Sequence, residues 1–488
     1  MTKDILKLAW PVFVGQIAVM LNGVIDTIMA GRLSAVDVAA IGLGASIYIS
    51  VYIGLMGVLV ALSPVVAQHY GARRYEQIGL ETRQAGWLAL LLAIPGCLAL
   101  ASSDLWLALS DPPPEVAAVA RPYLWGVAAG LPAALLFRVF HALSSAVALP
   151  RAVMTINLVG AALKVPLNAL FMYGLYVGDT AIVPALGGAG CGVATAIIAW
   201  LSLLLALVAL RAEPLYRTLG VVGGGGLGRP DPARLSGLLA LGLPIGASYL
   251  VEVTSFTFMA LFLARLGATT AASHQIAANL AALVYMLPLA LATATSVLVA
   301  QSIGAARPAE ARARAWAGLR IALGCALAIG IAVFASRRQL AALYTTDAGL
   351  AAAALPLLGL VAAFQLFDSA QAMCSFILRA YRITVLPMVV YVVSLWGIGL
   401  GGGWWLAFVA GASQRSWAPE VAGARGFWIA ACASLAVAAA GLAAILARVW
   451  GSKQQERTTR TDDAGAATRA SVPPRAQPGG VADRKRSR

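Results

Sequence analysis

The hydrophobic positions of the chain form long continuous runs separated by short polar stretches. A run of about 20 helical residues is needed to cross the hydrocarbon core of a bilayer. Runs of sufficient length lie at about 6–31, 38–68, 84–103, 117–147, 151–176, 187–210, 236–264, 270–302, 315–336, 348–378, 384–411 and 425–450. Because these runs are unbroken rather than alternating, they favour membrane helices over barrel strands. The pattern predicts an all-α integral membrane protein with about twelve transmembrane helices.

The composition excludes an ordinary water-soluble enzyme. Of the 488 residues, 60% are hydrophobic and 11% are charged, whereas a soluble domain carries about 45–50% apolar and about 25% charged residues. The five cysteines lie in apolar runs and lack the spacing of a metal site or a disulfide framework. Sequence signatures of zinc enzymes, P-loop proteins and serine hydrolases are also absent. An integral-membrane enzyme is therefore disfavoured, and no cofactor is expected.

The formal net charge of +15 is interpreted as loop charge rather than as a nucleic-acid-binding surface. Lys and Arg are enriched in the cytoplasmic loops of membrane proteins. Among those in the loops and at the ends of the predicted helices, sixteen fall on one side of the membrane and seven on the other. This bias predicts that both termini are cytoplasmic. The polar residues 451–488 are expected to form a disordered cytoplasmic tail.

Residues 11–74 match residues 244–307 without a gap, at an offset of 233 residues. Matched positions with this offset are Pro11 and Pro244, Arg32 and Arg265, Gln68 and Gln301, and Gly71 and Gly304. Six predicted helices separate the copies, so both copies have the same orientation and form parallel repeats with a substrate path between them. The repeat predicts two six-helix lobes, 1–222 and 236–450, joined by a cytoplasmic linker at 223–235 and arranged around a central cavity.

Three of the twenty acidic residues lie inside predicted helices, namely Asp26, Glu252 and Asp368. A charge at mid-bilayer costs several kcal/mol, with estimates from about 3 upward, so these acids are candidates for function. Asp26 lies near a helix end, where snorkelling is an alternative. Glu252 and Asp368 belong to the same lobe and could share a cavity, in which two carboxylates hold a metal cation or share a proton.

Lys164 is the basic residue placed most firmly inside a helix, and it lies four residues before Asn168 on the same face. A buried Lys near Asp26 would neutralise that acid, whereas the alternative is that Lys164 snorkels to the membrane surface. The sequence leaves open whether Lys164 and Asp26 touch.

Polar side chains also occur along the eighth predicted helix, at His274, Gln275 and Asn279. For these three residues, hydrogen bonding within the core and contact with a substrate are equally open. The tryptophans Trp404, Trp405, Trp417 and Trp428 are expected in an aromatic belt at the membrane interface.

Several segments together resemble the multidrug and toxic compound extrusion (MATE) transporters, in particular their bacterial NorM-like branch. They are VIDTIMAGRLS (24–34), GGAGCGVATAI (187–197), VEVTSF (251–256), HQIAANLAALVYMLP (274–288) and FDSAQAMCSFILRAYR (367–382). The similarity covers about residues 5–450. It implies a monomeric secondary antiporter of the bacterial inner membrane, which exports organic cations in exchange for Na⁺ or H⁺ by alternating access.

The resemblance also implies roles for the three buried acids. Glu252 and Asp368 match the pair implicated in binding the coupling cation, and they would be metal ligands only if that cation is Na⁺. Asp26 matches the acid of the family's first helix. The chain departs from the family pattern LNxPLN with LKVPLN, because Lys164 replaces an Asn. A fixed positive charge there would disfavour Na⁺ in the first lobe.

A second departure is Phe364, which stands where some Na⁺-coupled relatives have Tyr. Phe364 and the polar residues named above, Lys164, Asn168, His274, Gln275 and Asn279, are the candidates for contacts with substrate or for a polar network in the first lobe. The main rival function is a flippase for lipid-linked precursors, which would favour a more cationic cavity. A channel is disfavoured because no pore-loop filter is evident.

Overall fold

The computed structural model describes residues 1–177, 180–221, 227–410 and 423–470. It has twelve helices that are long and apolar enough to cross a membrane, which confirms the number predicted from the hydrophobic runs. The chain divides into two compact units, Met1–Ala443 and Ala444–Arg488. All the side chains predicted to carry function belong to the first unit.

The elements of the first lobe follow one another with short connections. They are α1 (Thr2–Gly31), α2 (Ala35–Leu59), α3 (Leu62–Gly71), α4 (Tyr75–Ala101), α5 (Ser103–Ser110), α6 (Pro114–Ala146), α7 (Pro150–Asn168), the π-helix η1 (Ala169–Tyr173), β1 (Leu175–Val177), β2 (Thr180–Val183), α8 (Gly188–Ala212) and α9 (Pro214–Thr218). The antiparallel hairpin β1–β2 pairs Tyr176 with Ala181 and was not expected from the hydrophobic pattern.

The second lobe repeats the helical layout without a hairpin among its described residues. Its elements are α10 (Pro232–Ala264), α11 (Ala268–Gly304), α12 (Pro308–Tyr344), α13 (Ala348–Ala380), α14 (Val385–Tyr391), the π-helices η2 (Val392–Gly402) and η3 (Trp405–Ala410), and α15 (Ala424–Ala470). The eleventh predicted span is therefore a short α-helix followed by π-helical turns. Helix α15 continues into the predicted tail, and residues 471–488 lie outside those described.

Helix starts follow local chemistry. A proline occupies the first turn of α6, α7, α10 and α12, where its missing N–H is not needed. Asp231 accepts a hydrogen bond from the Ala233 amide at 3.0 Å and caps α10, and Asp347 caps α13 through the Gly349 amide at 2.7 Å. Proline and aspartate residues that flank the apolar runs therefore set where these membrane helices begin.

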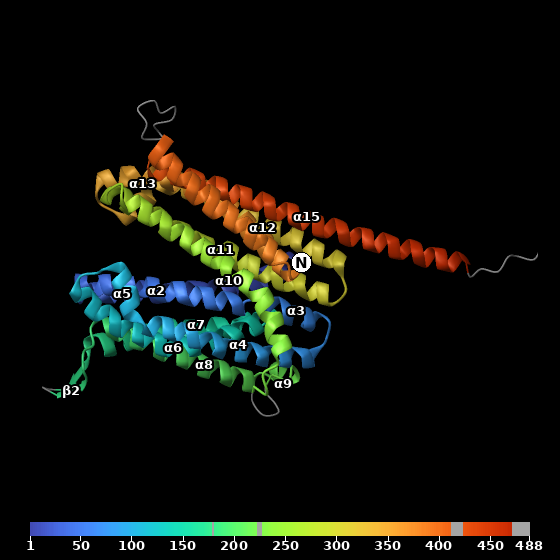
Figure 1. The fold of residues 1–488 in the computed structure, drawn as a ribbon, viewed down its shortest axis with the longest axis horizontal. Coiled ribbons are helices and arrows are strands. Elements are labelled where there is room, and N and C mark those ends of the chain that lie inside the picture. Colours follow the sequence, from blue (N-terminus) through green and yellow to red (C-terminus); the bar gives the residue numbers. More distant parts are fainter. Residues whose placement is uncertain (178–179, 222–226, 411–422, 471–488) are drawn as a thin grey trace, which may run out of the picture. The chain divides into compact units, whose positions relative to one another are not determined.

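Figure 1 shows α1–α9 (blue to green) and α10–α13 (yellow-green to orange) as two bundles. Within the first lobe α6 packs against α2, α4 and α8, and within the second α11 packs against α12 and α13. The lobes touch where α2 packs against α10 and where α11 packs against α1 and α3.

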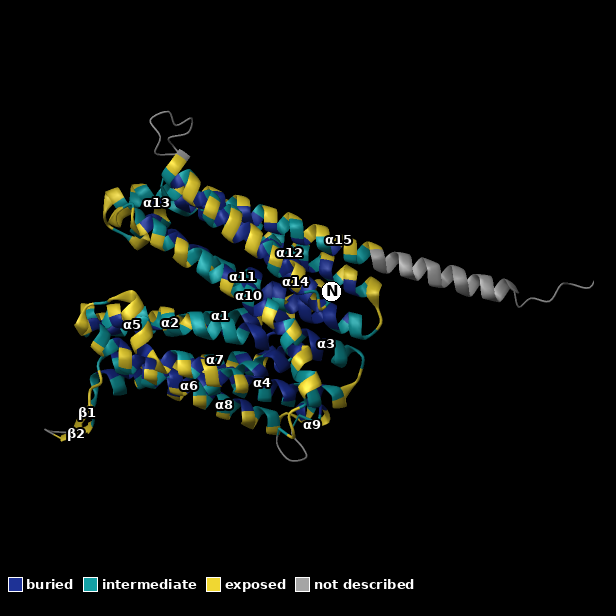
Figure 2. Ribbon diagram, viewed as in Figure 1, coloured by how far each residue is buried: buried dark blue, intermediate teal, exposed yellow. Residues whose placement is uncertain are grey.

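Burial follows these contacts. All residues of 371–380, at the end of α13, are buried, as are most residues in the last third of α11 (Figure 2). The lobe junction thus holds the most densely buried helix ends of the molecule.

Candidate functional site

The second lobe contains the two acids Glu252 on α10 and Asp368 on α13. Asp368 is 6% exposed and Glu252 is half-buried. Their carboxylates lie close enough to interact electrostatically. Neither acid takes part in an ion pair within the described parts of the chain. Two like charges this close to each other favour a bound cation or a shared proton.

Asp368 is held by a hydrogen-bonded chain. Gln371, one turn along α13, donates from Nε2 to Asp368 Oδ1 at 2.8 Å. The hydroxyl of Tyr391, at the end of α14, donates to Gln371 Oε1. Gln371 and Tyr391 are 1% and 3% exposed, so the chain is shielded from solvent. Neither Gln371 nor Tyr391 stands out in the sequence, although the spacing of three between Asp368 and Gln371 places these two on one helix face.

Arg379 adds a buried positive charge near the acids. The predicted helix 348–378 ends just before Arg379, so the charge bias places this residue in a cytoplasmic loop; the structure instead places it in the last turn of α13, where it is 5% exposed. Its guanidinium donates to the Tyr249 hydroxyl at 2.7 Å and stacks 4.5 Å from the centre of the Phe376 ring. It also interacts electrostatically with Glu252. Arg379 is therefore a buried cation next to Glu252 rather than a loop residue.

An aromatic cluster lies beside the acids. Phe364, one turn before Asp368, is 3% exposed and packs edge-on against Phe256 and Trp428 with ring centres 5.9 and 5.5 Å apart. His274 packs against Trp428 with ring centres 5.9 Å apart. The cluster fixes the α10–α13 packing next to the acids.

The positions of the tryptophans correct part of the belt prediction. Trp428 is fully buried, so its assignment to an interfacial belt was wrong, because the residue packs inside the second lobe. Trp404 and Trp405 are about half exposed, at 45% and 48%. Trp417 lies outside the described residues.

Among the polar candidates of α11, His274 belongs to the aromatic cluster beside the acids, whereas Gln275 and Asn279 lie on the exposed face of the helix. His274 is 2% exposed, and its Nδ1 atom is buried without a hydrogen-bond partner. On the exposed face the Asn279 amide donates to the Gln275 carbonyl at 3.1 Å. These contacts leave the Gln275 side chain available to a partner in solution or lipid.

The first lobe pairs its acid with a lysine. Lys164 Nζ lies 2.9 Å from Asp26 Oδ1, and Asn168 donates to the same oxygen at 2.7 Å. Lys164 also donates to the Thr195 hydroxyl on α8 at 2.6 Å, and the Cys191 thiol lies close enough to Asp26 to interact with it electrostatically. The question left open by the sequence is thus answered, because Lys164 and Asp26 are in direct contact.

This network is largely buried. Asp26, Lys164 and Asn168 are 9%, 1% and 0% exposed. Lys164 therefore does not snorkel. Thr195 and Cys191 were missed in the sequence because their spacing of four on α8 carries no signal by itself.

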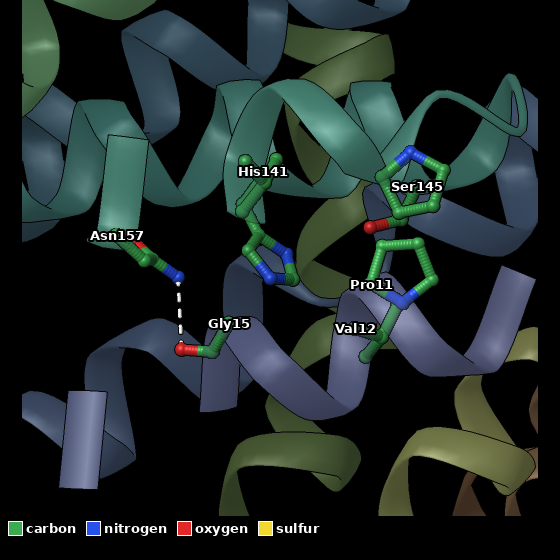
Figure 3. A pocket seen from close by; sticks show the side chains of 8 residues that line it. Pro11, Val12, Gly15, His141, Ser145 and Asn157 are labelled. Atoms are coloured by element: carbon green, nitrogen blue, oxygen red, sulfur yellow. Dashed lines mark hydrogen bonds between the residues drawn. The ribbon is translucent and has the colours of Figure 1, made fainter. Parts of the chain in front are cut away.

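A small cavity in the first lobe lies away from both sets of acids. Figure 3 shows His141 and Ser145 of α6 facing Pro11 and Val12 of α1, with Asn157 of α7 donating to the Gly15 carbonyl at 3.3 Å. Its free volume of about 10 Å³ is roughly that of one water molecule. It is too small to hold a drug.

Among the described residues, no group of three or more His, Cys, Asp or Glu side chains is arranged to hold a metal ion. A cation at Glu252 and Asp368 would thus have two carboxylates and would depend on neutral oxygens for further ligands. Candidates for these are the Gln371 and Tyr391 oxygens next to Asp368.

The chain matches the MatE family model twice, at residues 11–170 and 244–405. The two matches begin 233 residues apart, which is the offset of the internal repeat. A probable multidrug resistance protein NorM of Aromatoleum aromaticum is 41% identical over 421 residues, covering 86% of this chain and 88% of that protein. The multidrug resistance protein PmpM of Pseudomonas aeruginosa is 35% identical over 463 residues, covering 94% of this chain and 94% of that protein.

Solved structures share the fold. The eukaryotic MATE transporter AtDTX14 superposes with a TM-score of 0.80 at 20% identity, covering 93% of this chain and 98% of that chain. A MOP superfamily transporter from Pyrococcus furiosus superposes with a TM-score of 0.79 at 19% identity, covering 93% and 95%. These structures confirm the predicted architecture of twelve helices in two lobes.

Proposed function

The chain belongs to the MATE family of multidrug efflux transporters, and from that premise we propose that it is a secondary antiporter whose coupling cation binds at Glu252 and Asp368. Its substrates are drugs, in line with the names of its multidrug resistance relatives, and we assign organic cations among them as the transported class. The coupling cation is Na⁺ or H⁺. The transporter works as a monomer in the bacterial inner membrane with both termini in the cytoplasm.

The difference between the lobes carries this proposal. In the first lobe the Lys164 ammonium lies 2.9 Å from Asp26, so that carboxylate already has a cation of its own. In the second lobe Glu252 and Asp368 repel each other, and the nearest cation, Arg379, donates to Tyr249 rather than to a carboxylate. We therefore assign coupling to the second lobe and give Asp26, put forward from the sequence as a third coupling acid, a charge-compensated role.

Cation binding drives transport by shifting the equilibrium between two arrangements of the lobes, one open to the cytoplasm and one closed to it. A ligand shifts a conformational equilibrium only through different affinities for the two states. Contacts between the lobes, such as Arg234 of α10 with Glu81 of α4 at 2.6 Å, lie at the helix ends that the charge bias assigns to the cytoplasm. This arrangement supports a state closed to the cytoplasm, in which a cation at the acids favours release of the drug to the outside.

Transport by purified protein tests the proposal. Proteoliposomes with an imposed Na⁺ or pH gradient are loaded with ethidium, and efflux is compared for the wild type, Glu252→Gln and Asp368→Asn. Both variants are expected to lose the response to the gradient. Asp104→Asn is the control, because Asp104 is exposed and its ion pair is with exposed Arg121. Gradient-driven efflux at the wild-type rate in both acid variants would contradict the assignment.

The flippase alternative is less well supported by the charges. A lipid-linked pyrophosphate would need free cations, and the buried Lys164 is already bound to Asp26. Buried Arg379 is enclosed between Tyr249 and Phe376. The organic-cation exporter remains the function that the site favours.

A further inference from the structure

We propose that the chain binds the headgroup of an anionic phospholipid between Arg74 of the first lobe and Arg382 of the second, at the end of the lobe junction that the charge bias assigns to the cytoplasm. Arg74 directly precedes α4, and Arg382 lies two residues after the end of α13. Both residues are exposed, as is the neighbouring Arg73. We call these three residues the junction arginines. They are distinct from the proposed coupling acids, so the site adds a ligand to the proposed transporter.

A direct contact between the lobes brings the two turns together. Gln68, in the last turns of α3, donates to the Ala380 carbonyl at the end of α13 at 2.8 Å. Arg74 lies six residues after Gln68, and Arg382 lies two residues after Ala380. His69, next to Gln68, interacts electrostatically with both arginines. A headgroup held by Arg74 and Arg382 therefore touches both lobes at once.

The acids next to this site already have a cation. Arg234, at the start of α10, lies 2.6 Å from Glu81 and 3.3 Å from Asp231. Arg382 interacts electrostatically with Glu81, but the ion pair of that carboxylate is with Arg234. Glu81 is therefore committed to the contact between α4 and α10.

The junction arginines lack a comparable partner. None of them takes part in an ion pair within the described parts of the chain. The acid that follows them most closely in the sequence is Glu76, which is exposed on the first turn of α4. One exposed carboxylate cannot balance three guanidinium groups, so this surface favours an anion.

The internal repeat supplies a second junction for comparison. Arg307 is the counterpart of Arg74 at the offset of 233 residues, and it pairs with Glu310 at 3.4 Å. The counterpart of Glu310 is the uncharged Gln77. Gln77 accepts a hydrogen bond from Arg234 at 3.1 Å instead. Arg74 has thus lost the acid that its counterpart retains.

The backbone of the two turns does not require arginine. Arg73 and Arg382 have positive φ angles of 57° and 60°, a conformation that side chains other than Asn and Asp seldom adopt. The corresponding turns of the other junction have Ala306 and Ala148 at φ angles of 58° and 63°. Alanine therefore serves the same turn geometry. The arginines add a charge to one junction that folding of the turn does not explain.

The surroundings of Arg382 favour a lipid over a soluble phosphate. The planar guanidinium group binds phosphate through two parallel hydrogen bonds, and basic pockets at the cytoplasmic ends of membrane helices bind anionic headgroups. Arg382 is followed on α14 by Val385, Leu386 and Val389, which are 55%, 54% and 47% exposed. These side chains offer an apolar surface to acyl chains, for which a soluble phosphate has no use.

A headgroup that contacts both lobes also affects their arrangement. It keeps both contacts only while Arg74 and Arg382 stay close together, so it binds the arrangement closed at this end more tightly than the open one. A ligand with such a difference in affinity shifts the equilibrium toward the state that it prefers. The anionic lipid thus stabilises the closure that the contact between Gln68 and Ala380 begins.

Native mass spectrometry of the purified full chain in detergent tests the site, with phosphatidylglycerol as the anionic probe and phosphatidylcholine as the probe without net charge. The wild type is expected to bind phosphatidylglycerol more tightly. Arg74→Gln and Arg382→Asn are each expected to weaken that binding about fivefold, the contribution of one arginine near an anionic membrane surface, and to leave phosphatidylcholine unchanged. Asn is chosen for position 382 because it tolerates a positive φ angle. Both native side chains are exposed, so neither change removes a core contact.

Arg307→Gln is the matched control. It removes one exposed arginine at the position equivalent to Arg74, but the charge of Arg307 is already balanced by Glu310. Binding of phosphatidylglycerol is therefore expected to stay within about twofold of the wild type, because an exposed ion pair contributes little. A fall as large as that in Arg74→Gln would show general attraction of lipid to positive charge and overturn the site.

The remaining outcomes are equally decisive. Equal affinity of the wild type for the two lipids, or unchanged affinity in both arginine variants, overturns the proposal, and a fall in only one variant overturns the contact with both lobes. Glycerol 3-phosphate is the soluble probe, and the lipid assignment is wrong if it displaces phosphatidylglycerol at a similar concentration. Efflux is not measured, so failure here leaves the coupling role of Glu252 and Asp368 standing.

Discussion

Gln68 and Gln301, which occupy equivalent positions of the internal repeat, each bind the end of a helix in the opposite lobe. Gln68 on α3 donates to the Ala380 carbonyl at the end of α13, at 2.8 Å. Gln301 on α11 donates to the Ala146 carbonyl at the end of α6, also at 2.8 Å. Both acceptors are among the last carbonyls of their helices, which lack partners within the helix. We call these two reciprocal bonds the glutamine clasp.

The backbone around the clasp is tightly packed. A Cβ atom on Gly71 would collide with the Gln301 carbonyl, and one on Gly304 would collide with the Gln68 carbonyl. Only glycine allows the two helix ends to approach this closely. The repeat thus places a pair of identical contacts where the lobes meet, at the end assigned to the cytoplasm.

We predict that the variant Gln68→Leu with Gln301→Leu opens the cytoplasmic side more often than the wild type. Each hydrogen bond contributes about 0.5–1.5 kcal/mol, so each loss shifts the equilibrium by about two- to tenfold. Pulsed electron paramagnetic resonance between spin labels at the exposed, repeat-equivalent positions Glu76 and Ala309 measures the change, after the five native cysteines are replaced. A longer distance is expected to gain population.

Thr82→Val is the control for the clasp. The Thr82 hydroxyl is buried and bonds to the Ile78 carbonyl within its own helix, at 2.7 Å, so its loss does not touch the other lobe. The clasp has no role in closure if the double variant and Thr82→Val give the same distance distribution as the wild type.

A second closure contact is a crossing of α2 and α10 that is lined by glycine. A Cβ atom on Gly57 would lie 2.6 Å from Gly246 Cα, and one on Gly246 would lie 2.8 Å from the Gly54 carbonyl oxygen. We predict that Gly246→Ala forces these helices apart and lowers the rate of ethidium efflux. The same spin-label pair would report the weaker closure.

Gly237→Ala is the matched control on the same helix. Nothing lies within 4 Å of a Cβ atom at Gly237, and alanine favours a helix over glycine by about 1 kcal/mol. Efflux is therefore expected to be unchanged in this variant. Equal efflux in Gly246→Ala and Gly237→Ala would contradict the prediction, because it would show that close packing of α2 against α10 is not needed for transport.

The fold was largely predictable because the features that define it, the apolar runs and the internal repeat, can be read directly along the sequence. Apolar runs located the helices, and the offset between Gln68 and Gln301 located the repeat. The hairpin at Leu175–Val183 and the π-helix after Tyr391 were missed, because neither leaves a periodic signal in a short, apolar or glycine-rich segment. The eleventh span is continuous in hydropathy but not in backbone conformation.

The site was predictable only in part. Glu252 and Asp368 were candidates from the sequence because an acid inside a long apolar run is visible there and is costly to bury. Their partners Gln371 and Tyr391 depend on which helices touch, which the sequence does not state. Arg379 was placed in a loop by charge counting, since a last-turn arginine and a loop arginine look alike in sequence.

Lys164→Asn would leave Asp26 without its ammonium partner. The variant still offers Asn168, which donates to Asp26 at 2.7 Å, but the carboxylate becomes an unpaired buried charge. We predict that it then recruits Na⁺ or a proton, so that efflux acquires a new dependence on Na⁺ or pH. Efflux measured over a series of Na⁺ concentrations and pH values checks this, and identical profiles in wild type and variant would contradict it.

The free energy of the Asp26–Lys164 pair can be measured with a double-mutant cycle. Removing one partner of a buried ion pair costs about 3–5 kcal/mol, because it leaves an uncompensated charge, whereas removing both is often neutral. Asp26→Asn and Lys164→Met are therefore each expected to lower the apparent melting temperature, followed by tryptophan fluorescence in detergent. The double variant is expected to be more stable than either single variant, because contacting residues do not behave additively. If the two losses simply add, Lys164 and Asp26 act independently, and the charge-compensated role of the first lobe, on which the assignment of coupling to Glu252 and Asp368 depends, is wrong.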